Sequence, residues 1–375
     1  MLQPVWIEID TKAIRHNFLE VKRLVGSQTK IMAVVKADAY GHGAFQVGKV
    51  CLEAGADRLA VANLQEAIML RKQGITCPIM VLGWTPPENY QQALDNEIIL
   101  TMYDVHEAEQ LNALAESRGE KALIHLKIDT GMSRLGLVAN EDNIKQAAMI
   151  MGLSFVNVEG IYTHFSRDDE KDKAYSHWQL NRFLDFTAKL EENTGRKIPL
   201  KHAANSAAII DLPEAHLDLV RPGIILYGLK PSSEVDLSRI DLRPAFSLKA
   251  RVTRVAKFPP GTQVSYGGIF TTQRETLVAS LPLGYADGYT RLLTGKAEVL
   301  GKGQRLPVIG KICMDQCMID ITDSPEIKKG DVVILIGKGE KDEITVDEIA
   351  YKLGTINYEV ICMFSSRIPR VYISE

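Results

Sequence analysis

Residues 31–43 read IMAVVKADAYGHG, and this stretch decides how the first half of the chain is organised. Five apolar residues, including Val34 and Val35, are typical of a β-strand that is buried on both faces. Lys36 follows without a break. A buried strand does not end in an inward-pointing charge unless that charge has a partner, and a lysine placed there can form a covalent bond to a carbonyl group. The alternative is a lysine whose ammonium group reaches solvent at the strand end.

The composition is that of a globular protein with a large core. The chain has 375 residues, 46% of them hydrophobic and 24% charged, and a length of this kind favours two domains. A net charge of −3 gives no basic surface for nucleic acid or an anionic membrane. No secretory signal begins the sequence, and no apolar segment approaches the roughly 20 residues of a membrane span. Five cysteines form neither a disulfide framework nor a zinc site. We therefore expect a cytoplasmic protein without a metal ion.

Short apolar strands alternate with amphipathic helices up to about residue 230. The clearest helices cover residues 11–25, 104–119 and 177–192. Gly26 stops the first, Gly119 ends the second and Gly195 lies shortly after the third. Eight such repeats predict a closed parallel β/α barrel of the TIM type, because an open sheet would leave its edges uncovered. A doubly wound open sheet is the alternative, but its Gly-x-Gly-x-x-Gly fingerprint is absent after the first strand. The predicted strands are residues 31–35, 59–62, 79–82, 98–101, 123–128, 156–163, 199–202 and 217–227.

The pattern changes after residue 233. Strands separated by turns that contain proline or glycine follow one another, and only residues 345–353 read as a helix. We expect a barrel domain over residues 1–240 and a mostly β C-terminal domain over 241–375, with the first ten or so residues allowed to pack with the second domain. The predicted strands of that domain are residues 248–255, 275–281, 297–300, 306–309, 318–321 and 332–336.

The active site of a β/α barrel lies at the carboxyl ends of its strands. Taken alone, His164 is typical of a buried core histidine, the pair Asn205 and Ser206 of a helix cap, and Arg221 of a structural ion pair. Together these groups suit a ring cofactor that carries a phosphate and a phenolic oxygen. The polar residues that follow the predicted strands are Lys36, Tyr40, Lys127, Asp129, Arg134, His164, His202, Asn205, Ser206, Arg221 and Tyr227.

Eight motifs carry a resemblance to a known family. In chain order they are AVVKADAYGHG (33–43), DTGMSRLG (129–136), HAANSAA (202–208), RPGIILYGL (221–229), VSYGG (264–268), LGYADGY (283–289), GKICMDQCMID (310–320) and TINYEV (355–360). The chain resembles the bacterial alanine racemases, which depend on pyridoxal phosphate, and the resemblance covers nearly its whole length. It departs from many members at Ile361, where they have proline, and at Ser366, where they have tyrosine. Neither position carries a catalytic role.

The resemblance implies a role for each matching residue. Lys36 would bind pyridoxal phosphate covalently and act as the base on one face of the substrate, and Tyr266 would be the base on the other face. A homodimer is implied, because Tyr266 would serve the site of the partner subunit. Arg221 would contact the pyridine nitrogen of the cofactor, with His164 near its ring. Arg134 would bond the phenolic oxygen of the cofactor and help hold the substrate, and Met314 would help bind the substrate carboxylate. Binding of the phosphate is implied for Tyr40, Asn205, Ser206, Gly223, Ile224 and Tyr358.

The chemistry of racemisation is consistent with these roles. The Cα proton of an amino acid is removed on one face and returned on the other, so lysine and tyrosine must both work well below their free pKa values of about 10. Neighbouring positive charge, or burial for the lysine, is required to lower them. Arg221 keeps its own proton and should leave the pyridine nitrogen unprotonated, which favours racemisation over transamination or decarboxylation.

Lys127 has two interpretations. The resemblance suggests that CO2 carbamylates this lysine, so that an anion positions Arg134. The alternative is an ammonium group paired with Asp129.

Other functions remain open to the same motifs. Racemisation of serine, or of lysine and arginine, depends on a side-chain pocket that the motifs do not define, although Tyr285 and Tyr358 would favour a small substrate. Barrel-fold amino-acid decarboxylases share the architecture but pair the cofactor nitrogen with a carboxylate. The small pyridoxal-phosphate-binding barrel proteins lack a second domain. The role implied by the resemblance is supply of D-alanine for cell-wall peptidoglycan.

Overall fold

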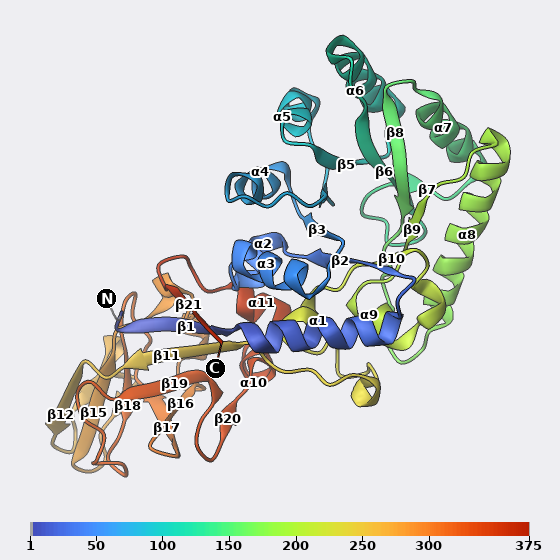
Figure 1. Cartoon of the computed structure of the whole chain (residues 1–375). Helices are drawn as coiled ribbons and strands as arrows, with labels where there is room; N and C mark the ends of the chain where they lie inside the picture. The colour runs from blue at the N-terminus through green and yellow to red at the C-terminus, as the bar shows by residue number, and fades with distance from the viewer. Residues whose placement is uncertain (1–2, 375) are drawn as a thin grey trace. The chain divides into compact units, whose positions relative to one another are not determined.

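The structure, a computed structural model, describes residues 3–374 and divides into two compact units (Figure 1). The barrel unit comprises Ala13–Ala39 and Ala44–Pro244. The β unit comprises the described residues up to Lys12, the segment Tyr40–Gly43 and the described residues from Ala245 onward. The domain limits expected from the sequence stay a prediction, and residues 1, 2 and 375, which they include, lie outside the described residues.

The barrel unit contains the eight expected parallel strands. Their order is β10-β2-β3-β4-β5-β6-β8-β9, with β7 (Leu137–Val138) paired to β6. The backbone N–H of Asp218 donates to the carbonyl of Lys201 at 3.1 Å, which joins the first strand of this order to the last. The predicted TIM-like barrel is confirmed. Its strands are β2 (Lys30–Val34), β3 (Arg58–Val61), β4 (Ile79–Val81), β5 (Ile98–Met102), β6 (Ala122–Asp129), β8 (Val156–Tyr162), β9 (Leu200–His202) and β10 (Leu219–Val220).

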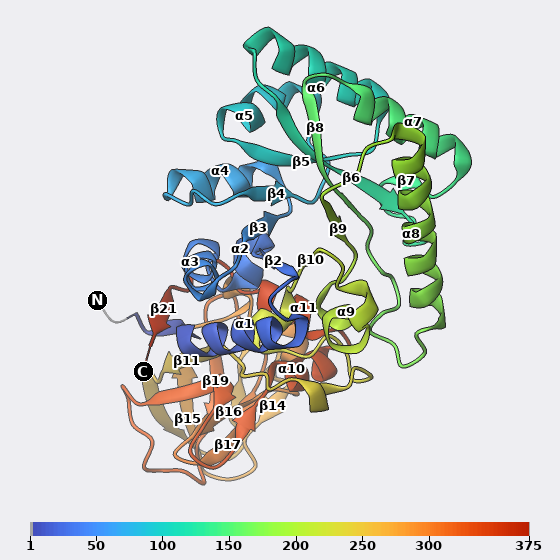
Figure 2. The ribbon, with the colours of Figure 1, turned by 45° about the vertical axis from the view of Figure 1, so that its right-hand side comes forward.

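Helices lie on the outer side of these strands (Figure 2). Asp104 caps α6 by accepting from the Glu107 N–H, and Gly119 ends it in the left-handed conformation. The apolar stripe of α1, which includes Ile14, Phe18 and Val21, is buried. The α-helices between residues 11 and 211 are α1 (Thr11–Val25), α2 (Lys36–Gly41), α3 (Ala44–Ala54), α4 (Leu64–Lys72), α5 (Tyr90–Asp95), α6 (Val105–Arg118), α7 (Glu141–Gly152), α8 (Ala174–Thr194) and α9 (Ser206–Asp211).

The first and last predicted strands end later than the observed ones. The strand expected over residues 31–35 ends at Val34, and Lys36 opens α2, a short left-handed helical turn. The strand expected over residues 217–227 ends at Val220. Pro222 has no N–H for a strand ladder and Gly223 has ψ −96°, so the chain leaves the sheet and forms a 3₁₀ turn at Ile224–Tyr227.

The β unit is built on a ten-stranded sheet. Its order is β12-β15-β18-β17-β16-β19-β11-β1-β21, with β20 paired to β19. Antiparallel pairs dominate, but β1 pairs parallel with β21. The strands are β1 (Val5–Asp10), β11 (Phe246–Arg251), β12 (Arg254–Phe258), β15 (Thr276–Leu281), β16 (Glu298–Gly301), β17 (Gln304–Ile309), β18 (Cys317–Asp320), β19 (Val332–Lys338), β20 (Glu343–Ile344) and β21 (Arg370–Ile373). A separate hairpin joins β13 (Gln263–Val264) to β14 (Phe270–Thr271).

Two helices lie in the C-terminal part of the β unit, where one was expected. Thr345 caps α10 (Val346–Leu353) as the sequence predicts, and Gly354 ends it. The second, α11 (Asn357–Cys362), was missed. Six residues are too few for a helical period to show, and the buried pair Val360 and Ile361 fits a strand equally well.

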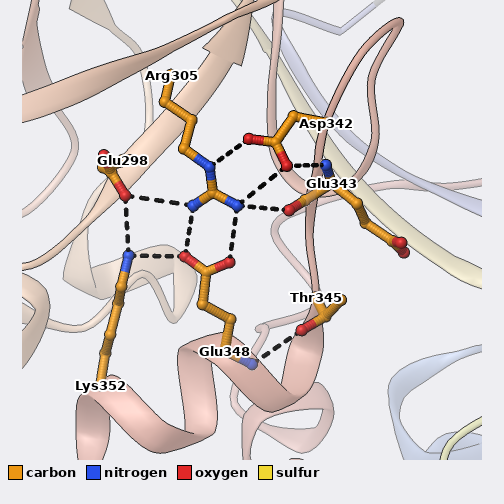
Figure 3. Close-up of polar contacts among 7 residues, drawn as sticks. All are labelled: Glu298, Arg305, Asp342, Glu343, Thr345, Glu348 and Lys352. Atoms are coloured by element: carbon orange, nitrogen blue, oxygen red, sulfur yellow. Dashed lines mark hydrogen bonds and ion pairs between the residues drawn. The ribbon is translucent and has the colours of Figure 1, made fainter.

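An ion-pair network fastens α10 to the β16–β17 hairpin (Figure 3). The Arg305 guanidinium on β17 lies 2.7 Å from Glu348 of α10, 3.3 Å from Glu298 of β16 and 2.5 Å from Asp342. Lys352 bonds both Glu298 and Glu348. The hydrogen bonds that Arg305 donates to Glu348 and Asp342 raise its pKa further above the usual value. A network of this kind holds a helix in register better than isolated surface pairs do.

Several absences hold for residues 3–374. None of their helices is long and apolar enough to cross a membrane. They contain no group of three or more histidine, cysteine, aspartate or glutamate residues arranged to hold a metal ion. All five cysteines are free thiols.

Candidate active site

Arg221 follows β10 at the carboxyl end of the barrel strands and is buried. Its Nη2 donates to the carbonyls of Thr163 (2.8 Å) and Ala203 (2.9 Å), and its Nη1 donates to Nδ1 of His202 (2.8 Å). Burial lowers the pKa of Arg221 to about 10. The guanidinium group therefore remains a cation at neutral pH and is held rigidly by three partners.

Lys127 lies near the end of β6 and is also buried. Burial, followed by the nearby Arg221 charge, lowers the pKa of Lys127 to about 7. Its Nζ donates to the carbonyl of Ile128 at 2.8 Å. The Asp129 carboxylate instead accepts from the backbone N–H groups of Gly131 (2.9 Å) and Ser133 (3.0 Å). The Lys127 amine thus has a backbone contact, and the Asp129 charge acts through space to raise its pKa, so the choice between carbamate and ammonium group stays open.

His164 marks the point where positive charges gather. The residue is partly buried, and desolvation of its ring lowers its pKa well below the usual value. Four cations lower it further, in the order Arg221, Arg134, Lys127 and Lys36. Together with His164, these groups come from the four barrel segments that follow or end β2, β6, β8 and β10, so the structure brings together residues that the sequence predicts at one end of the barrel. A neutral histidine among four cationic side chains fits an anionic ligand with several oxygens.

Three of the predicted phosphate-binding residues lie close together at the start of α9. The Ser206 hydroxyl accepts from the N–H of Gly223 at 2.9 Å, which joins α9 to the segment after β10. The Asn205 side chain caps α9 by accepting from the N–H groups of Ala207 and Ala208. Ile224 is buried at the first position of its 3₁₀ turn. Asn205 therefore has the capping role that its residue type favours, and Ser206 and Gly223 lie together as the cofactor prediction requires.

Lys36 opens a turn of unusual handedness. Residues 37–40 have φ between 51° and 54°, so four residues with side chains adopt the left-handed conformation in succession. Each such residue costs about 1–2 kcal/mol. The Glu66 carboxylate accepts from the N–H of Ala37 (2.8 Å) and from the N–H of Ala62 (2.7 Å), and so links the ends of β2 and β3. Strain held in place by such contacts is characteristic of functional sites.

The remaining predicted residues belong to the β unit. Tyr266 is 70% exposed and follows Ser265, whose φ of 65° is strained for a residue with a side chain. The Ser265 hydroxyl donates to the carbonyl of Lys311 at 2.7 Å, which fixes this turn to the segment before Met314. Met314 is 54% exposed. Both side chains are thus presented at the surface of the unit.

Tyr40 and Tyr358 lie together within the β unit, with ring centroids 6.2 Å apart. Burial raises the pKa of the Tyr40 hydroxyl, which therefore stays protonated and remains a hydrogen-bond donor.

Sequence reasoning missed two carboxylates in the barrel unit. Glu66 lies on α4, where a single glutamate looks like any solvated residue. Asp168 lies in the charged run RDDE, yet it is buried and its Oδ2 accepts from the N–H of Ala208 at the start of α9 (3.0 Å). Burial raises the pKa of Asp168 to about 6. No local signal distinguishes these carboxylates, because their partners lie on other segments.

Family comparisons cover almost the whole chain. The family model described as alanine racemase, N-terminal domain, matches residues 9–231, and the one described as alanine racemase, C-terminal domain, matches residues 245–372. An alanine racemase of Desulforamulus reducens is 51% identical over 373 residues, which cover 100% of both chains. An alanine racemase of Methanococcus maripaludis is 51% identical over 370 residues, which cover 99% of both.

Solved structures give the same relationship. An alanine racemase of Clostridium difficile superimposes with a TM-score of 0.96 at 44% identity, covering 100% of this chain and 97% of the other. A histidine racemase of Leuconostoc mesenteroides gives a TM-score of 0.91 at 28% identity, covering 99% and 98%. The fold is therefore shared with racemases of more than one amino acid.

Proposed function

The chain belongs to the alanine racemase family, and from that premise we propose how its residues divide the work of the reaction. It interconverts L-alanine and D-alanine. The observation that carries this conclusion is identity of about half the residues over the full length of alanine racemases, against 28% for the histidine racemase. Racemisation of serine, or of lysine and arginine, is the second candidate. The likeness to a histidine racemase supports it, because a protein of the same fold is named for a substrate with a different side chain.

We propose that pyridoxal phosphate is the cofactor, as family membership implies. When bound, it supplies a sink for the electrons left behind when the Cα proton departs. The basic side chains around His164, and the closeness of Ser206 to Gly223, support a site for its phenolic oxygen and its phosphate. The proposed phosphate ligands are Tyr40, Asn205, Ser206, Gly223, Ile224 and Tyr358.

We propose that Lys36 holds the cofactor covalently and moves the proton on one face of the substrate, while Tyr266 moves it on the other. The position of Lys36 before a strained turn supports this assignment, as does the 70% exposure of Tyr266. Arg134 would hold the phenolic oxygen of the cofactor and contact the substrate, and Met314 would contact the substrate carboxylate. The strong exposure of Tyr266 fits presentation to a partner subunit in a homodimer.

Arg221 is assigned to the ring nitrogen of the cofactor, with His164 near the ring. A guanidinium group with a pKa of about 10 would donate a hydrogen bond to that nitrogen and keep its own proton. This choice favours return of a proton to Cα over transamination and speaks against the barrel-fold decarboxylases, which would use a carboxylate there.

Carbamylation of Lys127 is part of the same proposal. The lowered pKa leaves a large fraction of neutral amine, which is the form that reacts with CO2. The carbamate would replace the positive charge of Lys127 with a negative one. That negative charge would attract Arg134 and Arg221, whose positive charges lower the pKa of the unmodified lysine. The proposed setting is the cytoplasm, where free thiols such as the five cysteines here are kept reduced, and the product D-alanine would serve peptidoglycan synthesis.

The test follows chirality and isotope together. L-alanine is added in D2O to the protein loaded with pyridoxal phosphate, and optical rotation and deuterium at Cα are recorded over time. We expect the rotation to fall to zero as deuterium enters Cα, because each face exchanges its proton with solvent. Deuterium entry without inversion would contradict the role of Tyr266, and the absence of both would contradict alanine as the substrate. Serine, lysine and arginine serve as comparison substrates.

A further inference from the structure

A chain of hydrogen bonds crosses the inside of the barrel from Arg58 to Arg221. Arg58, the first residue of β3, donates from Nη1 to Oε2 of Glu159 at 2.7 Å. The same oxygen lies 2.9 Å from Nε2 of His125. Nδ1 of His125 lies 2.8 Å from Nε2 of His202, and Nδ1 of His202 lies 2.8 Å from Nη1 of Arg221. This chain of hydrogen bonds runs from the amino end of β3 to the carboxyl end of β10.

The two ends of this chain fix the direction of every hydrogen bond in it. A guanidinium group only donates, so Nδ1 of His202 must accept and its Nε2 must carry the hydrogen. Nδ1 of His125 then accepts, and Nε2–H of His125 donates to the Glu159 carboxylate, which only accepts. The reverse arrangement would set an N–H of His202 against an N–H of Arg221 and a lone pair of His125 against the carboxylate.

The charge states agree with that direction. Burial lowers the pKa of His125, and burial followed by the Arg221 charge lowers the pKa of His202 well below its usual value, so both rings are neutral. Burial raises the pKa of Glu159, but its hydrogen bonds with His125 and Arg58 outweigh this and lower it to about 2. An ionised carboxylate therefore anchors the chain.

The backbone is shaped around these side chains. Ile124 pairs with Val158 and His125 with Gly160, so Glu159 is the extra residue of a β-bulge in β8. A bulge re-aims side chains at the point where it occurs. Gly160 leaves room for the imidazole, because a Cβ there would lie 2.5 Å from Nδ1 of His125.

The ring of Tyr162 completes this support. It stacks on His202 with centroids 4.9 Å apart and an interplanar angle of 2°, which leaves the imidazole plane little freedom. Rotation of His202 away from Arg221 is thus opposed by packing as well as by hydrogen bonds.

We propose that Glu159 is a positioning residue for racemisation, which acts through His125 and His202 to fix the tautomer of His202 and thereby hold the Arg221 guanidinium group in place. The inference rests on the proposed contact of Arg221 with the cofactor ring. Glu159 touches neither substrate nor cofactor in this role. Its effect resembles that of the outer partners of metal-binding histidines, which fix ring orientation and tautomer from a distance.

The first measurement reads the tautomers directly in the protein without added cofactor. ¹⁵N-histidine-labelled protein gives separate signals for protonated and unprotonated ring nitrogens, and His125→Gln and His202→Gln variants assign them among the eight histidines. We expect hydrogen on Nε2 and none on Nδ1 for both rings. A proton on Nδ1 of His202 would overturn the proposal.

The second measurement removes the anchor without leaving a buried charge behind. The double variant Arg58→Met with Glu159→Leu exchanges the ion pair for apolar side chains of similar size, a change that buried pairs often tolerate. We expect mixed tautomers at His202, a kcat for racemisation lower by about tenfold or more, and a larger share of turnovers that end in transamination. Glu159→Gln keeps an oxygen that can accept from His125 and should restore most of both properties.

A matched control separates positioning from folding. Glu191 on α8 is a buried carboxylate whose pKa is also lowered to about 2, where hydrogen bonds from Lys197 and Lys201 outweigh burial. Glu191→Gln should leave the His202 tautomer and the kcat within about twofold of the unaltered protein. Unchanged tautomers and kcat in the double variant would overturn the proposal. Failure of the unaltered protein to racemise alanine would contradict the function and leave the tautomer result standing.

Discussion

Lys127 shows at the residue scale how burial converts an ordinary side chain into a reactive one. The ammonium group finds one backbone carbonyl at 2.8 Å, while Arg221 and Arg134 both oppose its charge. Gly136 of the motif DTGMSRLG must remain a glycine beside it, since a Cβ there would lie 2.8 Å from the Lys127 carbonyl oxygen and 2.9 Å from its Cγ. The amine is therefore enclosed on several sides, and near neutral pH its charged and neutral forms are both present.

This state predicts a pH-dependent modification. The neutral amine attacks CO2, a nitrogen–carbon bond forms and one proton is released, so carbamate should increase as the pH rises through the Lys127 pKa of about 7 and disappear below it. With ¹³C-labelled bicarbonate, we expect a carbamate NMR signal at roughly pH 8 that fades at roughly pH 6. Lys127→Ala should lack the signal, and short carboxylic acids should restore part of its activity. If the carbamate signal is absent at both pH values, Lys127 is an unmodified lysine, as the alternative interpretation holds.

At the scale of an element, the left-handed turn after Lys36 is the feature that sequence patterns missed. Steric strain accompanies the positive φ angles of Ala37, Asp38, Ala39 and Tyr40. None of these residue types indicates the left-handed conformation as strongly as glycine does. The Asp38 carboxylate accepts from the N–H of Ala44 at 2.8 Å, and Glu66 holds the N–H of Ala37. These two carboxylates thus hold the backbone at the start of the turn and just after it.

Replacement of Glu66 should loosen this turn. Glu66→Gln exchanges one of two accepting oxygens for an amide donor that faces a backbone N–H, so we expect a loss of about 1–2 kcal/mol in the free energy of unfolding. Urea unfolding measures that loss, and hydrogen exchange at the Ala37 amide should become faster. Glu53→Gln on α3, which breaks only the exposed pair with Lys49, should change stability by less than about 0.5 kcal/mol. Equal exchange at Ala37 in both variants would contradict the role of Glu66.

For the whole molecule, the proposed bases belong to different units. Lys36 lies in the barrel unit, and Tyr266 lies in the β unit on a turn that is largely exposed. A chain that presents a catalytic side chain to a partner subunit forms mixed sites when two variants exchange subunits.

Mixing Lys36→Ala with Tyr266→Phe should therefore restore activity. Each variant alone lacks one base, but a hybrid dimer has one site with both, so random exchange should restore up to about a quarter of the sites. Racemisation is measured after subunit exchange has been verified with labelled protein. Mixing Lys36→Ala with a variant that carries both substitutions should restore nothing. No recovery in the first mixture would show that each subunit carries a complete site.

The barrel follows from the sequence because its repeating apolar strands and glycine-ended helices are local patterns. The sequence pattern predicts all eight strands, but it continues the last one through Pro222. Proline has no N–H for the hydrogen bonds between strands, and the observed strand ends at Val220. The roles of Lys36, Arg221 and Tyr266 came from motifs, and their assignment remains a proposal. Only the tertiary structure joins Glu159 to Arg221 through two histidines, because those residues lie on four separate segments. Burial and through-space charge lower the pKa of Lys127, and hydrogen bonds between distant segments carry the inferred tautomer of His202. Both are properties of the packed chain that no linear pattern records.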